Sequence, residues 1–143
     1  MKLLKQLILN TEVTKNNRRY LIGVLETIKN QINLSGQNIG TIGYTTDLVV
    51  TLADAAFTYS NAIIENDSLY ADIEIINTPK GIELKNIFEA ATDIRFRPAG
   101  QATLEGPMPV ETHNLLDIPK HVSDDYKLIS IAAITASEDA INF

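Results

Sequence analysis

The chain has 143 residues, of which 45% are apolar and 21% are charged, so it fits one globular domain, residues 1–143, rather than a disordered chain. It contains no cysteine, which excludes disulfide bonds, thiolate catalysis and thiolate metal sites. The net charge of −6 is uneven: six basic and two acidic residues precede position 31, whereas six basic and sixteen acidic residues follow. This acidic main body argues against nucleic acid as a ligand, because phosphate neutralisation needs a clustered basic surface.

The N-terminal segment is the basic part of the chain. Its opening MKLLKQLILN is too short and too polar for a signal-peptide core or a membrane span, so we expect an unsecreted protein without a membrane partner. Residues 3–9 fit a short strand or a helical turn, and residues 1–17 could form an N-terminal arm. The cations Lys15, Arg18 and Arg19 give this segment two interpretations, a docking arm for an acidic partner or an ordinary solvated face.

The next segments are less clearly patterned. Residues 18–28, RRYLIGVLETI, are rich in apolar and β-branched residues and favour a strand or a strand pair. Residues 32–47 carry Gly36, Gly40 and Gly43, but their spacing matches no phosphate-binding fingerprint, so we expect a turn-rich loop. Residues 48–56 fit a strand or a short helix.

Stronger signals follow. Apolar and polar residues alternate over 57–64 and 69–75 around the polar turn Glu65–Ser68, which predicts a β-hairpin. Residues 78–91 predict an amphipathic helix, because Thr78 suits the N-cap and Pro79 the first helical position. Its apolar stripe comprises Leu84, Ile87, Phe88 and Ala91.

The C-terminal third alternates between strands and a long connection. Residues 93–97 predict a short strand, and residues 100–120 form a long loop containing proline and glycine, of the kind that is mobile or committed to a partner. Residues 126–134, YKLISIAAI, are nearly all apolar and predict a buried central strand. The fold class is therefore α+β, with strands dominating and one well-defined helix.

This order of motifs resembles the maturation proteases of tailed-phage proheads, which are similar in fold to herpesvirus assemblins. The motifs are LYADIEI leading into Thr78-Pro79-Lys80-Gly81, a strand with a turn near residues 94–100, and the closing DYKLISIAAI. The likeness covers residues 43–140 and implies a barrel-like, strand-dominated sheet. It also implies a serine nucleophile, a histidine base and an acidic or second polar partner.

None of the three implied positions carries that chemistry. The serine falls on Arg95 or Phe96, the histidine on the segment GYTTD at residues 43–47, and the aspartate on Ala132. Three independent losses indicate that the scaffold is kept while the reaction is gone, so we expect no catalytic residue and lean towards a pseudo-protease.

Other chemistry is weaker. A replacement triad could use His113 or His121 with the nearby serines 123, 130 and 137 and aspartates 117, 124 and 125. No metal-binding or cofactor-binding spacing appears, so we expect neither a metal nor a cofactor. Arg95 and Arg97, on one side of their strand, either bind an acidic partner or pair within the fold, for example with Asp72 or Glu74.

The functional expectation is a non-enzymatic component of a phage virion, made in the host cytoplasm and located in the head. It would be an auxiliary or decoration protein that binds the major capsid protein, as a symmetric homo-oligomer, through the basic N-terminal segment and the 100–120 loop. The alternative is an active prohead serine protease with a divergent catalytic set. A third interpretation is an unrelated α+β binding domain whose motif order is coincidental.

Overall fold

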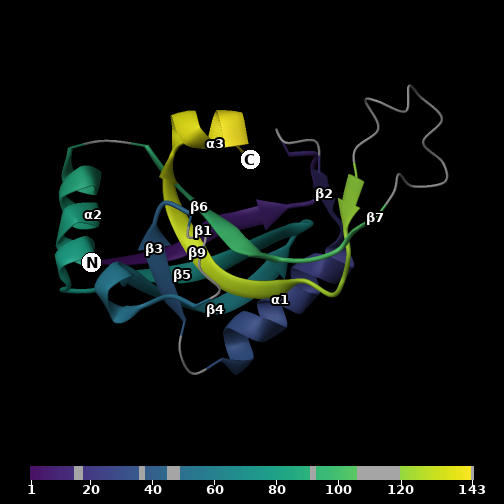
Figure 1. Cartoon of the computed structure of the whole chain (residues 1–143), viewed down its shortest axis with the longest axis horizontal. Helices are drawn as coiled ribbons and strands as arrows, with labels where there is room; N and C mark the ends of the chain where they lie inside the picture. The colour runs from purple at the N-terminus through teal and green to yellow at the C-terminus, as the bar shows by residue number, and fades with distance from the viewer. Residues whose placement is uncertain (15–17, 36–37, 45–48, 91–92, 106–119, 143) are drawn as a thin grey trace.

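The computed structural model describes residues 1–14, 18–35, 38–44, 49–90, 93–105 and 120–142 (Figure 1). The secondary-structure elements, in chain order, are β1 (Lys2–Asn10), β2 (Arg18–Tyr20), α1 (Ile22–Leu34), β3 (Ile39–Ile42), the 3-10 turn η1 (Leu52–Asp54), β4 (Phe57–Glu65), β5 (Ser68–Ile75), α2 (Pro79–Glu89), β6 (Ile94–Gln101), β7 (Leu104–Glu105), β8 (Lys120–Val122), β9 (Lys127–Thr135) and α3 (Ala136–Asn142). Within these ranges, no helix has both the length and the apolar character needed to cross a bilayer.

Six strands form one strongly curled sheet. Their order is β1-β5-β4-β3-β9-β6, and every neighbouring pair is antiparallel except β3 and β9. The curl brings the two outermost strands, β1 and β6, close to one another. This architecture confirms the expected α+β class and the barrel-like, strand-dominated sheet.

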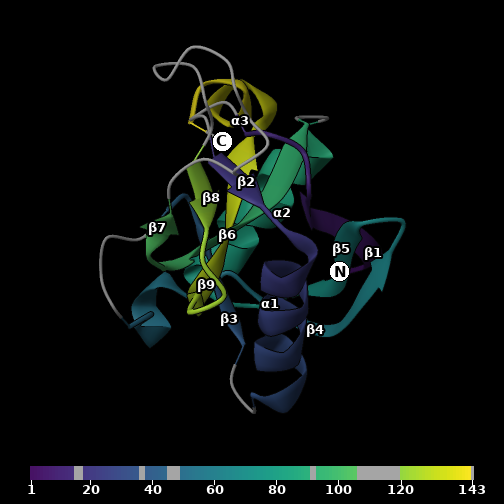
Figure 2. The same ribbon diagram turned by 90° about the vertical axis from the view of Figure 1, so that its right-hand side faces the viewer.

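A smaller sheet lies at one end of the molecule. Its order is β2-β8-β7, with β2 parallel and β7 antiparallel to β8 (Figure 2). It joins residues 18–20, which follow the expected N-terminal arm, to the two ends of the expected 100–120 loop. The interior of that loop, residues 106–119, lies outside the described residues.

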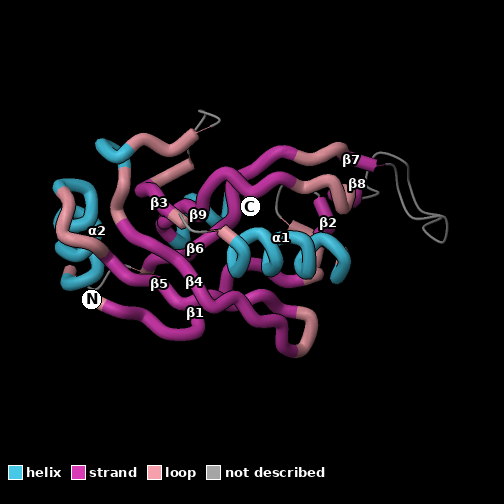
Figure 3. Tube along the Cα trace, turned by 90° about the horizontal axis from the view of Figure 1, so that it is seen from below, coloured by secondary structure: helices cyan, strands magenta, loops and turns pink. Residues whose placement is uncertain are grey.

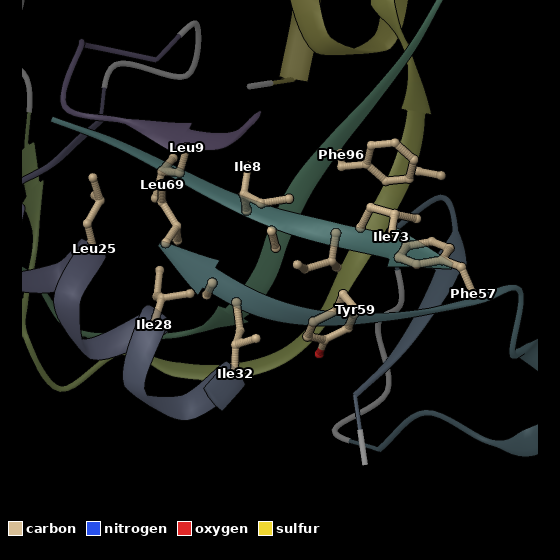
Figure 4. Packing of buried hydrophobic residues seen from close by; sticks show 14 of the residues in the cluster. Ile8, Leu9, Leu25, Ile28, Ile32, Phe57, Tyr59, Leu69, Ile73 and Phe96 are labelled. Carbon is tan, nitrogen blue, oxygen red and sulfur yellow. The ribbon is translucent and has the colours of Figure 1, made fainter. Parts of the chain in front are cut away.

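The core lies between α1 and the curled sheet. Helix α1 packs against β4, β5 and β9, and α2 lies at the far end of the molecule from the small sheet (Figures 1 and 3). Figure 4 shows side chains from α1 pointing towards side chains from β1, β4 and β5. The largest fully buried ones include Leu25, Ile28, Ile8, Phe57 and Ile73.

The hairpin and the α2 helix are confirmed. β4 and β5 pair as predicted, with Glu65 opposite Ser68 at the turn. The Thr78 hydroxyl accepts a hydrogen bond from the Gly81 backbone N–H at 3.0 Å, which caps the first turn of α2. Leu84 is fully buried. The helix ends at Glu89, two residues before the predicted end, and Ala91 lies outside the described residues.

The prediction of a strand over residues 18–28 was wrong for most of its length. Only Arg18–Tyr20 is a strand, and the chain is helical from Ile22 to Leu34. The buried residues Val24, Leu25, Ile28 and Ile32 recur at helical spacing, so packing of this stripe on the sheet overrides the β-branched composition. A second substantial helix, α1, therefore stands beside the single one expected.

Strands also form in segments whose structure the sequence left open. Residues 2–10 of the expected N-terminal arm form β1, which is hydrogen-bonded to β5 as part of the main sheet. The glycine-containing loop includes β3, in which Gly40 lies against the Phe57 ring. The strand expected at 93–97 extends to Gln101, and β9 lies between β3 and β6 as the buried strand predicted for residues 126–134.

Candidate functional site

The structure places two of the expected catalytic positions, Phe96 and Ala132, on the neighbouring strands β6 and β9, with β3 on the other side of β9. Ala132 of β9 is in register with Thr41 of β3 on one side and with Arg97 of β6 on the other. The next row joins Ala133 to Ile42 and to Phe96 in the same way. The β3 end leads directly into residues 43–47, of which 43 and 44 are described. Segments far apart in the chain thus lie side by side, but Ala132 shares a face with Arg97 and Phe96 shares one with Ala133, so Phe96 and Ala132 face opposite sides of the sheet.

The side chains of Ala132 and Phe96 have no catalytic chemistry. Ala132 is fully buried and presents a methyl group. Phe96 is 2% exposed and points into the core, where its ring packs edge-on against Phe57 at 5.3 Å between centroids. Successive strand residues face opposite sides of a sheet, so Arg95 and Arg97 lie on the other face. A serine protease needs a nucleophile and a base at such positions.

Arg97 is held by several acceptors. Its Nε donates to Asp139 Oδ1 at 2.7 Å and its Nη2 donates to Asp139 Oδ2 at 3.1 Å. Its Nη1 donates to the Phe96 carbonyl at 3.2 Å and to the Ile8 carbonyl of β1 at 3.4 Å. The guanidinium therefore joins β6 to α3 and to the opposite edge of the curled sheet.

The charges of this ion pair act on the pKa of Tyr44. Partial burial raises the pKa of its phenol to about 12, the Asp139 carboxylate adds to that rise, and the Arg97 cation opposes it. A phenol with a pKa this high is protonated near neutral pH. It is therefore not a ready base for a nucleophile.

Two buried hydroxyls lie near the row, and both donate to backbone carbonyls. Thr41, 4% exposed, donates from Oγ1 to the Gly43 carbonyl at 2.8 Å. Ser130, fully buried on β9, has the carbonyls of Ile39 and Ile131 within 3.1 Å of its Oγ. Activation of a hydroxyl requires a base that accepts its proton. A backbone carbonyl does not serve as one.

His121 lies away from this row. His121 is on β8 of the small sheet, in register with Arg19 and with Glu105, and His113 lies outside the described residues. Asp125, a candidate partner for a replacement triad, accepts hydrogen bonds from the Thr103 N–H at 2.9 Å and the Thr103 hydroxyl at 2.6 Å. These bonds lower the pKa of the Asp125 carboxyl.

One cleft borders the ion pair. It encloses about 160 Å³, which is below the roughly 300–1,000 Å³ of typical small-molecule sites. It is lined by Leu7, Leu9, Asn10, Glu12, Val13, Thr14, Arg97 and Asp139. Within the described part of the chain, no group of three or more histidine, aspartate or glutamate residues is arranged to hold a metal ion.

The arginines proposed for partner binding on β6 pair within the fold. Arg95 contacts Asp93 at 3.0 Å, and Arg97 contacts Asp139, so the partners are not Asp72 or Glu74. Asp72 instead accepts from the Lys5 backbone N–H and the Asn61 amide. Both arginines thus form ion pairs within the fold, with carboxylates other than those expected, and partner binding by either stays a prediction.

The other partner-binding candidates lie on or beside β2. Arg18 is in register with Lys120 of β8, and Arg19 with His121, while Lys15 lies outside the described residues. Sequence reasoning missed Lys120, because nothing in its local pattern marks it. Only the strand pairing places it next to Arg18.

Comparisons with known proteins give a structural match alone. No protein-family model matches the chain, and no curated protein sequence matches it. Among solved structures, the chain is similar to the bacteriophage T4 capsid assembly protease, gp21, with a TM-score of 0.77. The match covers 92% of this chain and 80% of that chain at 19% sequence identity. The fold is therefore similar to that of this capsid assembly protease, as the motif order indicated.

Proposed function

We propose that this chain is a non-enzymatic component of a phage head, an auxiliary or decoration protein that binds the major capsid protein. The observation that carries this proposal is the row formed by Thr41, Ala132 and Arg97 together with Phe96. Of these residues, Ala132 stands where the resemblance implies the aspartate and Phe96 where it can place the serine, and neither carries that chemistry; the segment GYTTD at residues 43–47, where it implies the histidine, contains none.

The physical argument is that a protease scaffold without these groups has no route to attack an amide. A serine hydroxyl needs a positioned base, and both buried hydroxyls near the row donate to main-chain carbonyls instead. The basic group at the row, Arg97, is committed to Asp139. What the scaffold keeps is a folded surface, and binding functions are carried by surfaces rather than by folds.

The small sheet is the part of the surface best suited to partner contact. The sequence pointed separately to the basic N-terminal segment and to the 100–120 loop, and β2, β7 and β8 bring residues of both into one sheet. A capsid offers the same surface many times, so a homo-oligomer with modest affinity per copy would be retained through several simultaneous contacts.

The first experiment asks whether the protein stays in the particle. Mass spectrometry of purified proheads and mature heads should find it in both at one fixed ratio to the major capsid protein, and density maps should place it at symmetric capsid positions. Loss of the protein on maturation, as expected of a protease that is consumed, would contradict the proposal.

The second experiment asks whether the protein has proteolytic activity. Purified protein incubated with its capsid precursor should produce no cleavage, and a serine-reactive phosphonate should label no residue. An active prohead protease serves as the positive control in both assays. Specific labelling of one serine, or cleavage that is abolished when that serine is changed to alanine, would establish the alternative function of an active prohead protease.

A further inference from the structure

Two cations stand side by side on the small sheet. Arg18 of β2 and Lys120 of β8 are in register in a parallel pair, and both residues are exposed. Among the described residues, neither side chain forms an ion pair with a carboxylate. Two like charges are therefore held next to each other on a chain whose net charge is −6.

The register that creates this pair is firmly set. Two residues further along, on the same face of the two strands, Tyr20 and Val122 are 6% and 3% exposed. Side chains two positions apart share a face of a strand, so burial of this second pair fixes the position of the first. The two cations are thus presented from an anchored piece of backbone.

Like charges directly opposite one another on neighbouring strands destabilise a sheet. An arrangement that repels itself in the free protein is relieved when a group of opposite charge binds it. We propose that Arg18 and Lys120 form a docking site for an acidic peptide segment of a partner protein, one that presents two carboxylates about 5–6 Å apart, as neighbours on a helix face do. This inference deepens the proposed function, and rests on it for the partner being a head protein.

The surroundings favour recognition through carboxylate side chains rather than through backbone pairing. The Arg18 backbone N–H and carbonyl are already bonded to the hydroxyl and N–H of Thr14, at 3.1 and 2.7 Å. Arginine binds a carboxylate through two parallel hydrogen bonds, and lysine adds a second point charge. Nucleic acid is a poorer match, because an acidic body repels a continuous polyanion.

The test uses the full chain and a labelled, alanine-based helical peptide of about sixteen residues with two glutamates four positions apart on one face, followed by fluorescence anisotropy at about 50 and about 300 mM salt. The double variant R18Q/K120Q should bind this peptide about tenfold more weakly, and higher salt should weaken the original chain towards the same affinity. The matched control K80Q/K85Q removes the same charge from exposed lysines of α2 and should change affinity less than about twofold. Arg18→Lys keeps the charge and should keep most of the binding.

Three outcomes would overturn the site. These are equal weakening in the two double variants, unchanged binding by R18Q/K120Q, or tighter binding of a short DNA duplex than of the acidic peptide. The particle experiment separates this inference from the proposed function. If the peptide does not bind the original chain and R18Q/K120Q stays in heads at the normal ratio, the docking site is wrong while the head function stands. Loss of both peptide binding and head retention in this variant alone supports the site.

Discussion

Arg97 of β6 and Asp139 of α3 form a two-point ion pair, with 2.7 Å between Nε and Oδ1 and 3.1 Å between Nη2 and Oδ2. The two side chains are 12% and 20% exposed. The remaining guanidinium nitrogen reaches the Ile8 carbonyl of β1, so the pair ties the C-terminal helix to both edges of the curled sheet. Arg97 is in register with Ala132, the position at which the resemblance implies the aspartate.

Asp139→Asn should destabilise the protein by about 2 kcal/mol, because it leaves the Arg97 cation partly buried without its counter-charge. The matched control is Asp93→Asn, at the residue just before β6. Asp93 pairs with Arg95, but those side chains are 64% and 44% exposed, so the loss should stay below about 0.5 kcal/mol. Urea unfolding of the two variants measures both values. Equal losses would show that the Arg97–Asp139 pair has no special structural role.

Stability should fall at alkaline pH through Tyr59. Burial raises the pKa of this phenol from 10.0 to about 12, because its side chain is only 4% exposed. The neutral form is favoured in the folded state, so its contribution is fully present below pH 10 and is lost as the pH rises from 10 towards 12. Over that interval the free energy of unfolding should drop by about 1.4 kcal/mol per pH unit from this residue.

Tyr59→Phe isolates that contribution. Chemical denaturation of both proteins across this pH range should give a shallower decline for the variant, since Phe cannot ionise. Burial also raises the pKa of Tyr126, so some alkaline loss should remain in the variant. Parallel pH profiles for the two proteins would contradict the assignment to Tyr59.

Thr78→Ala should weaken the start of α2. The hydroxyl accepts from the Gly81 N–H and also contacts the Ala55 carbonyl, so its loss leaves a backbone donor and an acceptor unsatisfied. N-cap losses of this kind cost about 1–2 kcal/mol. Thermal unfolding should show a lower Tm for Thr78→Ala and a value near the original for Thr78→Ser, which keeps the hydroxyl. A similar fall in both variants would point to the methyl group instead.

R18Q/K120Q should leave the fold as stable as before, or more stable by up to about 1 kcal/mol, because it removes a repulsion between strands β2 and β8. Thermal unfolding at low salt measures the gain, which should shrink as salt screens the original repulsion. If the two cations had a structural role, the same variant would lower the Tm, and the docking interpretation would lose its physical basis.

The sequence predicted best where the decisive residues are neighbours in the chain. The hairpin depends on alternation around Glu65–Ser68, and α2 on Thr78, Pro79 and a helical stripe, all of which are local patterns. The same pattern reasoning failed at residues 22–34. There the composition favours a strand, while packing of Leu25 and Ile28 against the sheet decides for a helix.

The sequence by itself also determined which catalytic groups are missing. No fold can supply a serine at position 96, an aspartate at position 132 or a histidine within residues 43–47, because the chain has other residues there. Only the tertiary structure decided which side chains are in contact in this region. Arg97 forms its ion pair with Asp139, which lies 42 residues further along the chain. Likewise, the pairing of β2 with β8 sets Arg18 beside Lys120. The reason is that such contacts depend on strand order, register and the curl of a sheet. These are set by the packing of the whole core, and no short stretch of residues encodes them.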